Sequence, residues 1–123
     1  MSFGWFLYVF HLFFVSAIFL YIGLYRTDIP RWIFPGLLGL GSIVGLYHLY
    51  KAYLHVSEGT VPWVNMIHIL VVAPLLISIG YFQTETPRFV FELMLMVGFA
   101  VSGYHVVKIY RELNGGDGRA KRE

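Results

Sequence analysis

The sequence predicts an all-α integral membrane protein, a four-helix bundle made of two tandem parallel two-helix repeats. Three observations predict it. The chain carries few charged residues, its apolar residues form four long stretches, and it matches itself when shifted by 57 residues.

The composition is unlike that of a soluble domain. Of the 123 residues, 58% are hydrophobic and 13% are charged, and the mean hydropathy is +0.67. Soluble domains carry about 25% charged residues, which cover their surface. The net charge of +2 is too small to indicate nucleic-acid binding, and there is no cysteine for a disulfide or a thiolate metal site.

Four stretches have the length of a membrane span. No Asp, Glu, Lys or Arg occurs in Phe3–Tyr25, Trp32–Tyr50 or Gly59–Thr84, and Glu92 is the only one in Phe89–Val107. A helix needs roughly 20 apolar residues to cross the hydrocarbon core. Because lipid offers the backbone no hydrogen-bond partner, each stretch is expected to be helical.

The self-match indicates a tandem duplication. Each copy of the repeat contains two stretches joined by a tight loop with a Thr-x-x-Pro-Arg pattern. The identical pairs include His11/His68, Ile22/Ile79, Gly23/Gly80, Thr27/Thr84, Pro30/Pro87, Arg31/Arg88, Phe34/Phe91, Leu38/Leu95, Gly41/Gly98, Val44/Val101, Tyr47/Tyr104, His48/His105, Lys51/Lys108 and Tyr53/Tyr110.

The repeats define the expected domain organisation. Residues 1–113 form one four-helix transmembrane domain, with repeat 1 at about 3–54 and repeat 2 at about 60–111. Residues 114–123 are polar and glycine-rich, which predicts a flexible tail. Proline suits the first turn of a helix, so Pro30, Pro62 and Pro87 are expected to begin the second, third and fourth helices.

Lysine and arginine predict the orientation. A two-helix repeat returns the chain to its starting side, so the two copies enter the membrane in parallel. By the positive-inside rule, both termini are predicted to be cytoplasmic. The basic residues on that side are Lys51, Lys108, Arg111, Arg119, Lys121 and Arg122, against Arg26, Arg31 and Arg88 on the other. Lys51 and Lys108 are expected to anchor their helix ends at the lipid headgroups.

Small residues mark a packing face on the second and fourth stretches. Gly41 and Gly45 precede His48 at helical spacing, and Gly98 and Ser102 precede His105 in the same way. The small-xxx-small pattern lets membrane helices approach closely. We expect these faces to bring the second and fourth helices together or to mediate assembly.

The four repeated histidines are the candidate site. His11, His48, His68 and His105 are predicted to lie at one depth, roughly 5–9 Å to the cytoplasmic side of the midplane. Polar groups inside a membrane are costly and are often functional. Three kinds of site fit them: axial ligation of haem b, a transition metal in an imidazole cluster, and a proton relay.

A purely structural interpretation of the histidines stays open beside these. Neutral imidazoles can hydrogen-bond across helices, with Asn65, Tyr47, Tyr104 or Ser102 as candidate partners. His55 is expected at the interface rather than at a site. Glu92 lies one turn after Arg88, which predicts an i,i+4 ion pair.

No catalytic residues are identified, because the chain lacks paired carboxylates, a Ser–His–Asp set and a phosphate-binding loop. The sequence therefore favours a non-enzymatic protein with a structural or assembly role. Its expected partners are the lipid bilayer and a second copy or another membrane protein. The alternative is a haem-binding, metal-binding or proton-handling bundle that uses the histidines.

One resemblance adds a further alternative. The aromatic helix ends Tyr47–Lys51 and Tyr104–Lys108 resemble those of small membrane proteins, including those of large DNA viruses. The resemblance implies a membrane component of a virus particle.

Overall fold

The structure is a computed structural model that describes residues 3–114. Within that range it is helical, with short turns and no strand. Four helices are long and apolar enough to cross a membrane: Gly4–Asp28, Ile33–Ser57, Trp63–Glu85 and Arg88–Leu113. The prediction of four membrane-length helices is confirmed. The predicted flexible tail, apart from Asn114, lies outside the described residues.

Two of the four helices contain an internal π-helical turn. The first runs through α1 (Phe3–Phe10), a π turn at His11–Val15 and α2 (Ser16–Tyr25). The third runs through α4 (Trp63–Ile67), a π turn at His68–Val72 and α5 (Ala73–Phe82). The second and fourth helices are α3 (Ile33–Ser57) and α6 (Arg88–Leu113). Short 3-10 turns follow α2 at Arg26–Asp28 and α5 at Gln83–Glu85.

The chain separates into two compact units. Unit 1 comprises residues 1–24 and 94–123, and unit 2 comprises residues 25–93. Each unit therefore combines residues from both expected repeats. The prediction of a single domain over residues 1–113 concerns both units together and stays a prediction.

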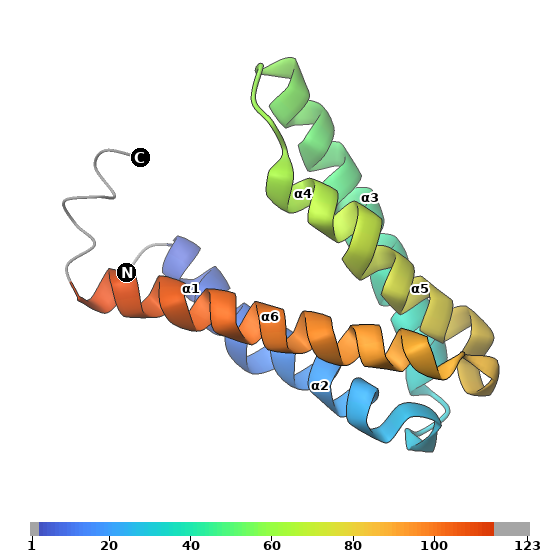
Figure 1. The fold of residues 1–123 in the computed structure, drawn as a ribbon. Coiled ribbons are helices and arrows are strands. Elements are labelled where there is room, and N and C mark those ends of the chain that lie inside the picture. Colours follow the sequence, from blue (N-terminus) through green and yellow to red (C-terminus); the bar gives the residue numbers. More distant parts are fainter. Residues whose placement is uncertain (1–2, 115–123) are drawn as a thin grey trace. The chain divides into compact units, whose positions relative to one another are not determined.

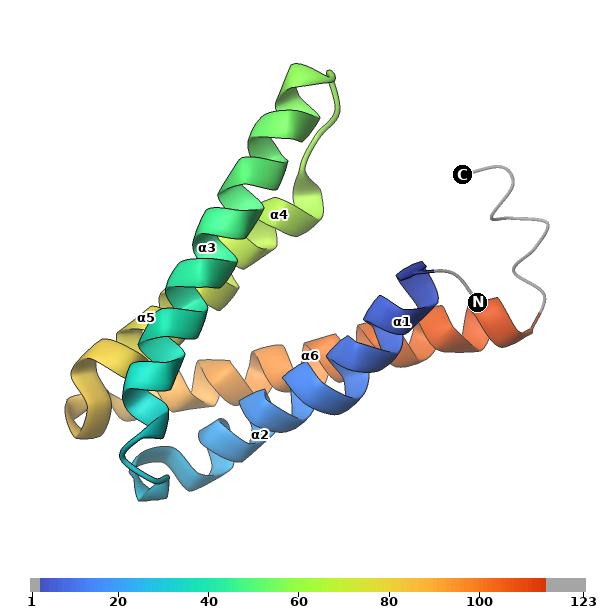
Figure 2. The same cartoon turned by 180° about the vertical axis from the view of Figure 1, so that it is seen from behind.

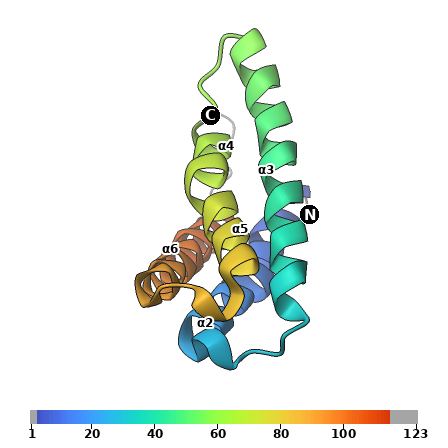
Figure 3. The same cartoon turned by 90° about the vertical axis from the view of Figure 1, so that its right-hand side faces the viewer.

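Unit 2 is a helical hairpin. α3 lies along α4 and α5, and the loop at residues 58–62 joins them (Figure 1, Figure 3). Thr60 closes this loop onto the end of α3, because its N–H donates to the carbonyl of His55 over 2.8 Å. The Thr60 hydroxyl also donates to that carbonyl and lies 3.0 Å from His55 Nδ1. His55 therefore has a local role at the end of the hairpin.

Unit 1 places α1 and α2 along α6, so the first and last helices of the chain are neighbours (Figure 2). The buried side chain of Phe19 and the half-buried side chain of Leu20 contact the position of Gly98. The packing partners are thus first with fourth and second with third. The tight Thr-x-x-Pro-Arg loops instead join the first helix to the second and the third to the fourth, so helices that are joined by a tight loop are not the packing partners.

The π turns begin at equivalent histidines but have different local causes. Pro74, in the first turn of α5, has no N–H, and its ring would clash with a carbonyl one turn earlier in a regular helix. In unit 1 the equivalent position is Ala17. There the Ser16 hydroxyl donates to the carbonyl of His11 over 3.1 Å. The Ser16 backbone N–H bonds to the same carbonyl, five residues earlier, which is the π-helical pattern.

Two of the three predicted prolines directly precede a helix, and the third, Pro30, lies three residues before one. α6 begins directly after Pro87 and α4 directly after Pro62. α3 begins at Ile33, because the Pro30 carbonyl first accepts from Ile33 N–H in a turn. The predicted ion pair is confirmed, with Arg88 Nε 3.1 Å from Glu92 Oε1.

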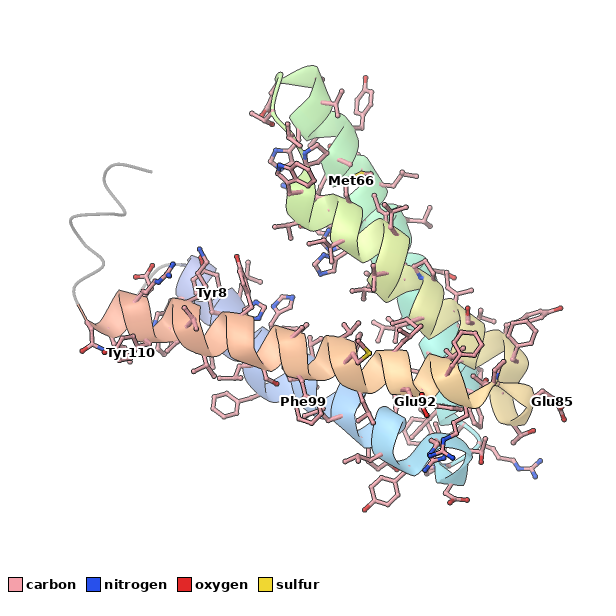
Figure 4. All side chains as sticks on the ribbon, in the orientation of Figure 1. Tyr8, Met66, Glu85, Glu92, Phe99 and Tyr110 are labelled. Carbon is pink, nitrogen blue, oxygen red and sulfur yellow. The ribbon has the colours of Figure 1, made fainter. Side chains whose placement is uncertain are left out.

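Large apolar side chains remain exposed in the middle of the spans. Phe13 is 70% exposed, Ile43 is 67% exposed and Phe99 is 65% exposed. Phe99 and Tyr110 project away from α6 (Figure 4). Contact of such side chains with water is unfavourable, whereas contact with lipid carries no such penalty. The exposed surface of the spans therefore suits a hydrocarbon environment.

Candidate functional site

The four repeated histidines form two pairs, one in each unit. His48 faces His68 in unit 2, and His11 faces His105 in unit 1. All four side chains are half-buried. Because a shift of 57 residues carries His11 onto His68 and His48 onto His105, the two pairs occupy equivalent positions of the two units.

The pair in unit 2 is a close face-to-face stack. The ring centroids of His48 and His68 are 3.9 Å apart and the ring planes differ by 14°. His68 Nδ1 lies 2.7 Å from the carbonyl oxygen of Val64 in its own helix. His48 Nδ1 lies 2.8 Å from Oδ1 of Asn65, a buried side chain on the facing helix. The predicted cross-helix hydrogen bond from a histidine to Asn65 is confirmed.

These hydrogen bonds decide the tautomer of both rings. A carbonyl oxygen can only accept, so each Nδ1 carries a hydrogen and donates it. In a neutral ring the lone pair then lies on Nε2. The two acceptors come from adjacent residues of α4, Val64 and Asn65. Both stacked rings therefore direct Nδ1 toward α4.

The pair in unit 1 is more open. The centroids of His11 and His105 are 5.1 Å apart, with ring planes that differ by 10°. His11 Nδ1 donates to the carbonyl of Leu7 over 2.7 Å, and His105 Nδ1 donates to that of Val101 over 2.8 Å. These acceptors lie on two different helices, so the Nδ1 edges do not turn toward a common helix.

One substitution between the repeats accompanies the difference. Tyr8 stands at the position in unit 1 that Asn65 occupies in unit 2. Its ring lies beside His105 with a centroid distance of 6.0 Å, and the side chain is labelled in Figure 4. The amide of Asn65 supplies a cross-helix acceptor where Tyr8 supplies a ring contact. The acceptor of His105 is the Val101 carbonyl of its own helix.

The other candidate partners of the histidines have different contacts. Tyr47 and Tyr104 each lie edge-on to the following histidine, His48 and His105. The Ser102 hydroxyl donates to the carbonyl of Gly98 over 2.9 Å. Among residues 3–114, no group of three or more His, Asp or Glu side chains comes together as a metal site would require.

The small-residue faces contact a neighbouring helix within each unit. A Cβ on Gly41 would lie 2.9 Å from side-chain atoms of Leu76 and Ile77, and one on Gly45 would lie 3.4 Å from Ala73. A Cβ on Gly98 would lie 3.0 Å from Leu20. The partners are α5 and α2, respectively. A contact between the second and fourth helices, which lie largely in different units, stays a prediction.

The closest approach between two helices is at Gly80, a position that the sequence patterns did not single out as a packing site. A Cβ on Gly80 would lie 2.5 Å from the backbone nitrogen of Leu38 and 2.7 Å from the carbonyl oxygen of Phe34. Its equivalent, Gly23, would meet the Leu95 side chain at 2.6 Å. Their identity between the repeats was the available signal, because a glycine inside a membrane helix at matching positions often marks close packing.

The two lysines lie one helical turn beyond the paired histidines. Both Lys51 and Lys108 are half-buried, and Lys108 Nζ lies 5.6 Å from the ring centroid of Tyr104. An ammonium over an aromatic face is attracted by the ring quadrupole. The anchoring of Lys51 and Lys108 at the lipid headgroups stays a prediction.

Comparison with known proteins identifies no family for this chain. No protein-family model, no curated protein and no solved structure matches the chain.

Proposed function

We propose that this chain is a small polytopic membrane protein with a structural or assembly role, in which a duplicated pair of helices forms a four-helix bundle. The observation that carries the proposal is the repeated glycine contact. Gly41 against Leu76 and Ile77 recurs as Gly98 against Phe19 and Leu20, each shifted by 57 residues. Membrane helices gain van der Waals packing at such contacts without a hydrophobic driving force.

The surface of the spans supports the same role. Their exposed apolar side chains suit lipid or an apolar face of another membrane protein. In this proposal the partners are the bilayer and a second copy or another membrane protein, with no nucleic acid. Both termini are cytoplasmic. Single cysteines introduced at Ser57 and at Thr27 test this orientation in sealed vesicles, since the chain has no cysteine of its own. Labelling of Thr27→Cys from the cytoplasmic side would contradict it.

Gly41→Leu and Gly98→Leu test the packing role. Each leucine would have to displace side chains already in contact, so both variants should lower the thermal stability in detergent. Gly36→Leu is the matched control, because no atom lies within 4 Å of a Cβ built there. Unchanged stability of the first two variants would contradict the proposal.

A second function, cofactor or proton handling at His11, His48, His68 and His105, is favoured by the recurrence of stacked imidazoles next to π turns. Turns of this kind occur frequently at functional sites. Haem b has the weaker support. Metal–imidazole bonds of about 2 Å would put two axial nitrogens about 4 Å apart across an iron. The rings of His48 and His68 face one another with nearly parallel planes, so their in-plane nitrogen lone pairs do not point at an iron between them.

A visible absorption spectrum of the purified protein, oxidised and reduced, tests the haem alternative. A Soret band that shifts on reduction would restore haem b. The further alternative, a membrane component of a large DNA virus particle, requires that the chain be found in purified particles and be absent from host membranes of uninfected cells.

A further inference from the structure

We propose that the π turn of unit 1 is a conformational switch, whereas the equivalent π turn of unit 2 is fixed. In unit 1 the turn at His11–Val15 converts to a regular α-helical turn, and α1 rotates about its axis along α6. The rotation changes which side chains α1 presents to His105. This device goes beyond the assembly role and does not depend on it, and it lies entirely within unit 1 (Figure 2).

Pro74 fixes the π turn of unit 2. It lies in the first turn of α5, two residues after the π turn at His68–Val72. In a regular α-helix its ring would clash with the carbonyl four residues earlier, that of Leu70. Membrane helices accommodate proline through local adjustments such as a π turn. The regular α-helical form is therefore closed to this segment.

Unit 1 can adopt both forms, because Ala17 stands where unit 2 has Pro74 and has the N–H that proline lacks. The neighbouring Ser16 side chain is buried, and its hydroxyl and its N–H both donate to the His11 carbonyl, five residues earlier. In the α form both groups take the carbonyl four residues earlier, that of Leu12, an acceptor that serines inside helices use. The buried hydroxyl therefore has a partner in either form.

The two forms present different side chains to α6. A π turn holds one residue more than an α turn, so its loss rotates α1 by about 100°, the angle per residue at 3.6 residues per turn. In the structure Tyr8 and His11 lie beside His105. In the α form Val9 and Leu12 take their places. The conversion thus replaces an aromatic and polar face with an aliphatic one and separates the two imidazoles of unit 1.

The composition of α1 permits the rotation. Phe3–Phe10 contains no Asp, Glu, Lys or Arg, and Phe6 and Phe10 are exposed. Because lipid is as apolar as these side chains, exchanging lipid contacts for helix contacts changes their free energy little. The same rotation in unit 2 would break the 2.8 Å hydrogen bond between His48 and Asn65. Unit 2 therefore resists the conversion through this bond as well as through its proline.

Cysteine cross-linking in the full-length protein, which has no cysteine of its own, distinguishes the two forms. Leu12→Cys with His105→Cys forms an intramolecular disulfide only in the α form, and His11→Cys with His105→Cys reports the π form. We expect both pairs to cross-link in mild detergent under an oxidant. Cross-linking of the second pair alone would overturn the proposal. Cross-linking of neither would contradict the contact of His11 with His105, on which the proposal rests.

Ala17→Pro gives unit 1 the proline of unit 2. It should slow the cross-linking of Leu12→Cys with His105→Cys roughly tenfold or more, because the proline closes the α form. Cross-linking of His11→Cys with His105→Cys should persist, which verifies that α1 still packs on α6. An unchanged rate for the first pair in the presence of Ala17→Pro would overturn the proposal.

The matched control is the equivalent cysteine pair of unit 2, Ile69→Cys with His48→Cys. It should cross-link roughly tenfold more slowly than the pair of unit 1, because Pro74 fixes the π turn. Pro74→Ala should raise its rate. Equal rates in the two units would overturn the contrast between a switchable and a fixed turn. Ala17→Pro should leave the oligomeric state unchanged, which separates this result from a failure of the assembly role.

Discussion

Units 1 and 2 bring equivalent residues together, but the two units differ in the spacing and in the hydrogen-bond acceptors of their histidine pairs. In both units a histidine begins a π turn and faces a second histidine, and in both a glycine allows two helices to approach. In unit 2 the histidine ring centroids are 3.9 Å apart and the two rings donate to separate acceptors on one helix. In unit 1 the centroids are 5.1 Å apart and the two acceptors lie on two helices.

The difference shows how a duplicated site can diverge through its neighbours. The histidines themselves are identical in the two repeats, and the residue beside them is Asn65 in one and Tyr8 in the other. A side-chain amide can accept a hydrogen bond across the helix interface, and that bond sets the orientation of the ring. One position next to the histidines therefore accompanies a change in the hydrogen bonding and spacing of the two rings.

The largest expected effect contrasts the two glycines. Gly80→Ala should lower the free energy of unfolding by about 3 kcal/mol, because its Cβ would meet backbone atoms of Leu38 and Phe34. Gly23→Ala should cost less, about 1–2 kcal/mol, since its two shortest contacts are with the Leu95 side chain, which can move, and the backbone nitrogen of Leu95 lies 3.1 Å away. Unfolding in detergent with increasing denaturant measures both.

Gly36→Ala is the control for this pair. No atom lies within 4 Å of the added Cβ, so the gain in helix propensity should leave the protein unchanged or stabilise it by up to about 1 kcal/mol. Equal losses at Gly80 and Gly23 would remove the contrast between a backbone contact and a side-chain contact.

The second prediction tests Asn65 against Tyr8. Asn65→Leu should destabilise the protein by about 2 kcal/mol, because the Nδ1–H of His48 loses its acceptor in partly buried surroundings. Tyr8→Leu removes one ring contact with His105 and should cost about 0.5–1 kcal/mol. Thermal unfolding followed by circular dichroism compares them. The reverse order of stability would mean that the hydrogen bond does not hold the stack.

The smallest effect on stability is expected at Arg26 and Gln83, where the two repeats have the same backbone φ. Arg26 and Gln83 both adopt a φ of 52°, and the ψ of Gln83 is −120°, a conformation that favours glycine. Arg26→Gly and Gln83→Gly should each stabilise the protein by about 1 kcal/mol, because a strained conformation of this kind costs about 1–3 kcal/mol. Melting temperatures in the same detergent measure the gain.

Thr84→Gly serves as the reference for these loop variants. Thr84 lacks a positive φ, so glycine there only adds conformational freedom to the unfolded chain and should destabilise. A loss of stability in Gln83→Gly of the same size would show that the backbone at Gln83 is not strained.

Much of the fold could be predicted from local patterns. The apolar stretches predicted the four helices, the spacing of Arg88 and Glu92 predicted their ion pair, and the position of Asn65 three residues before His68 marked it as a partner for an imidazole. The π turns were not predicted. In unit 2 the signal was Pro74, whose missing N–H prevents a regular helix, but Ala17 gave no such signal in unit 1.

The sequence by itself determined where the helices lie and which residues recur, because hydrophobicity and hydrogen bonding within a helix depend on neighbouring residues. Only the tertiary structure decided that the first helix packs with the fourth and the second with the third. It also decided that Gly80 packs against backbone atoms and that two imidazoles donate to neighbouring residues of α4. These features depend on which distant surfaces meet, and a one-dimensional pattern of residue types does not specify that pairing.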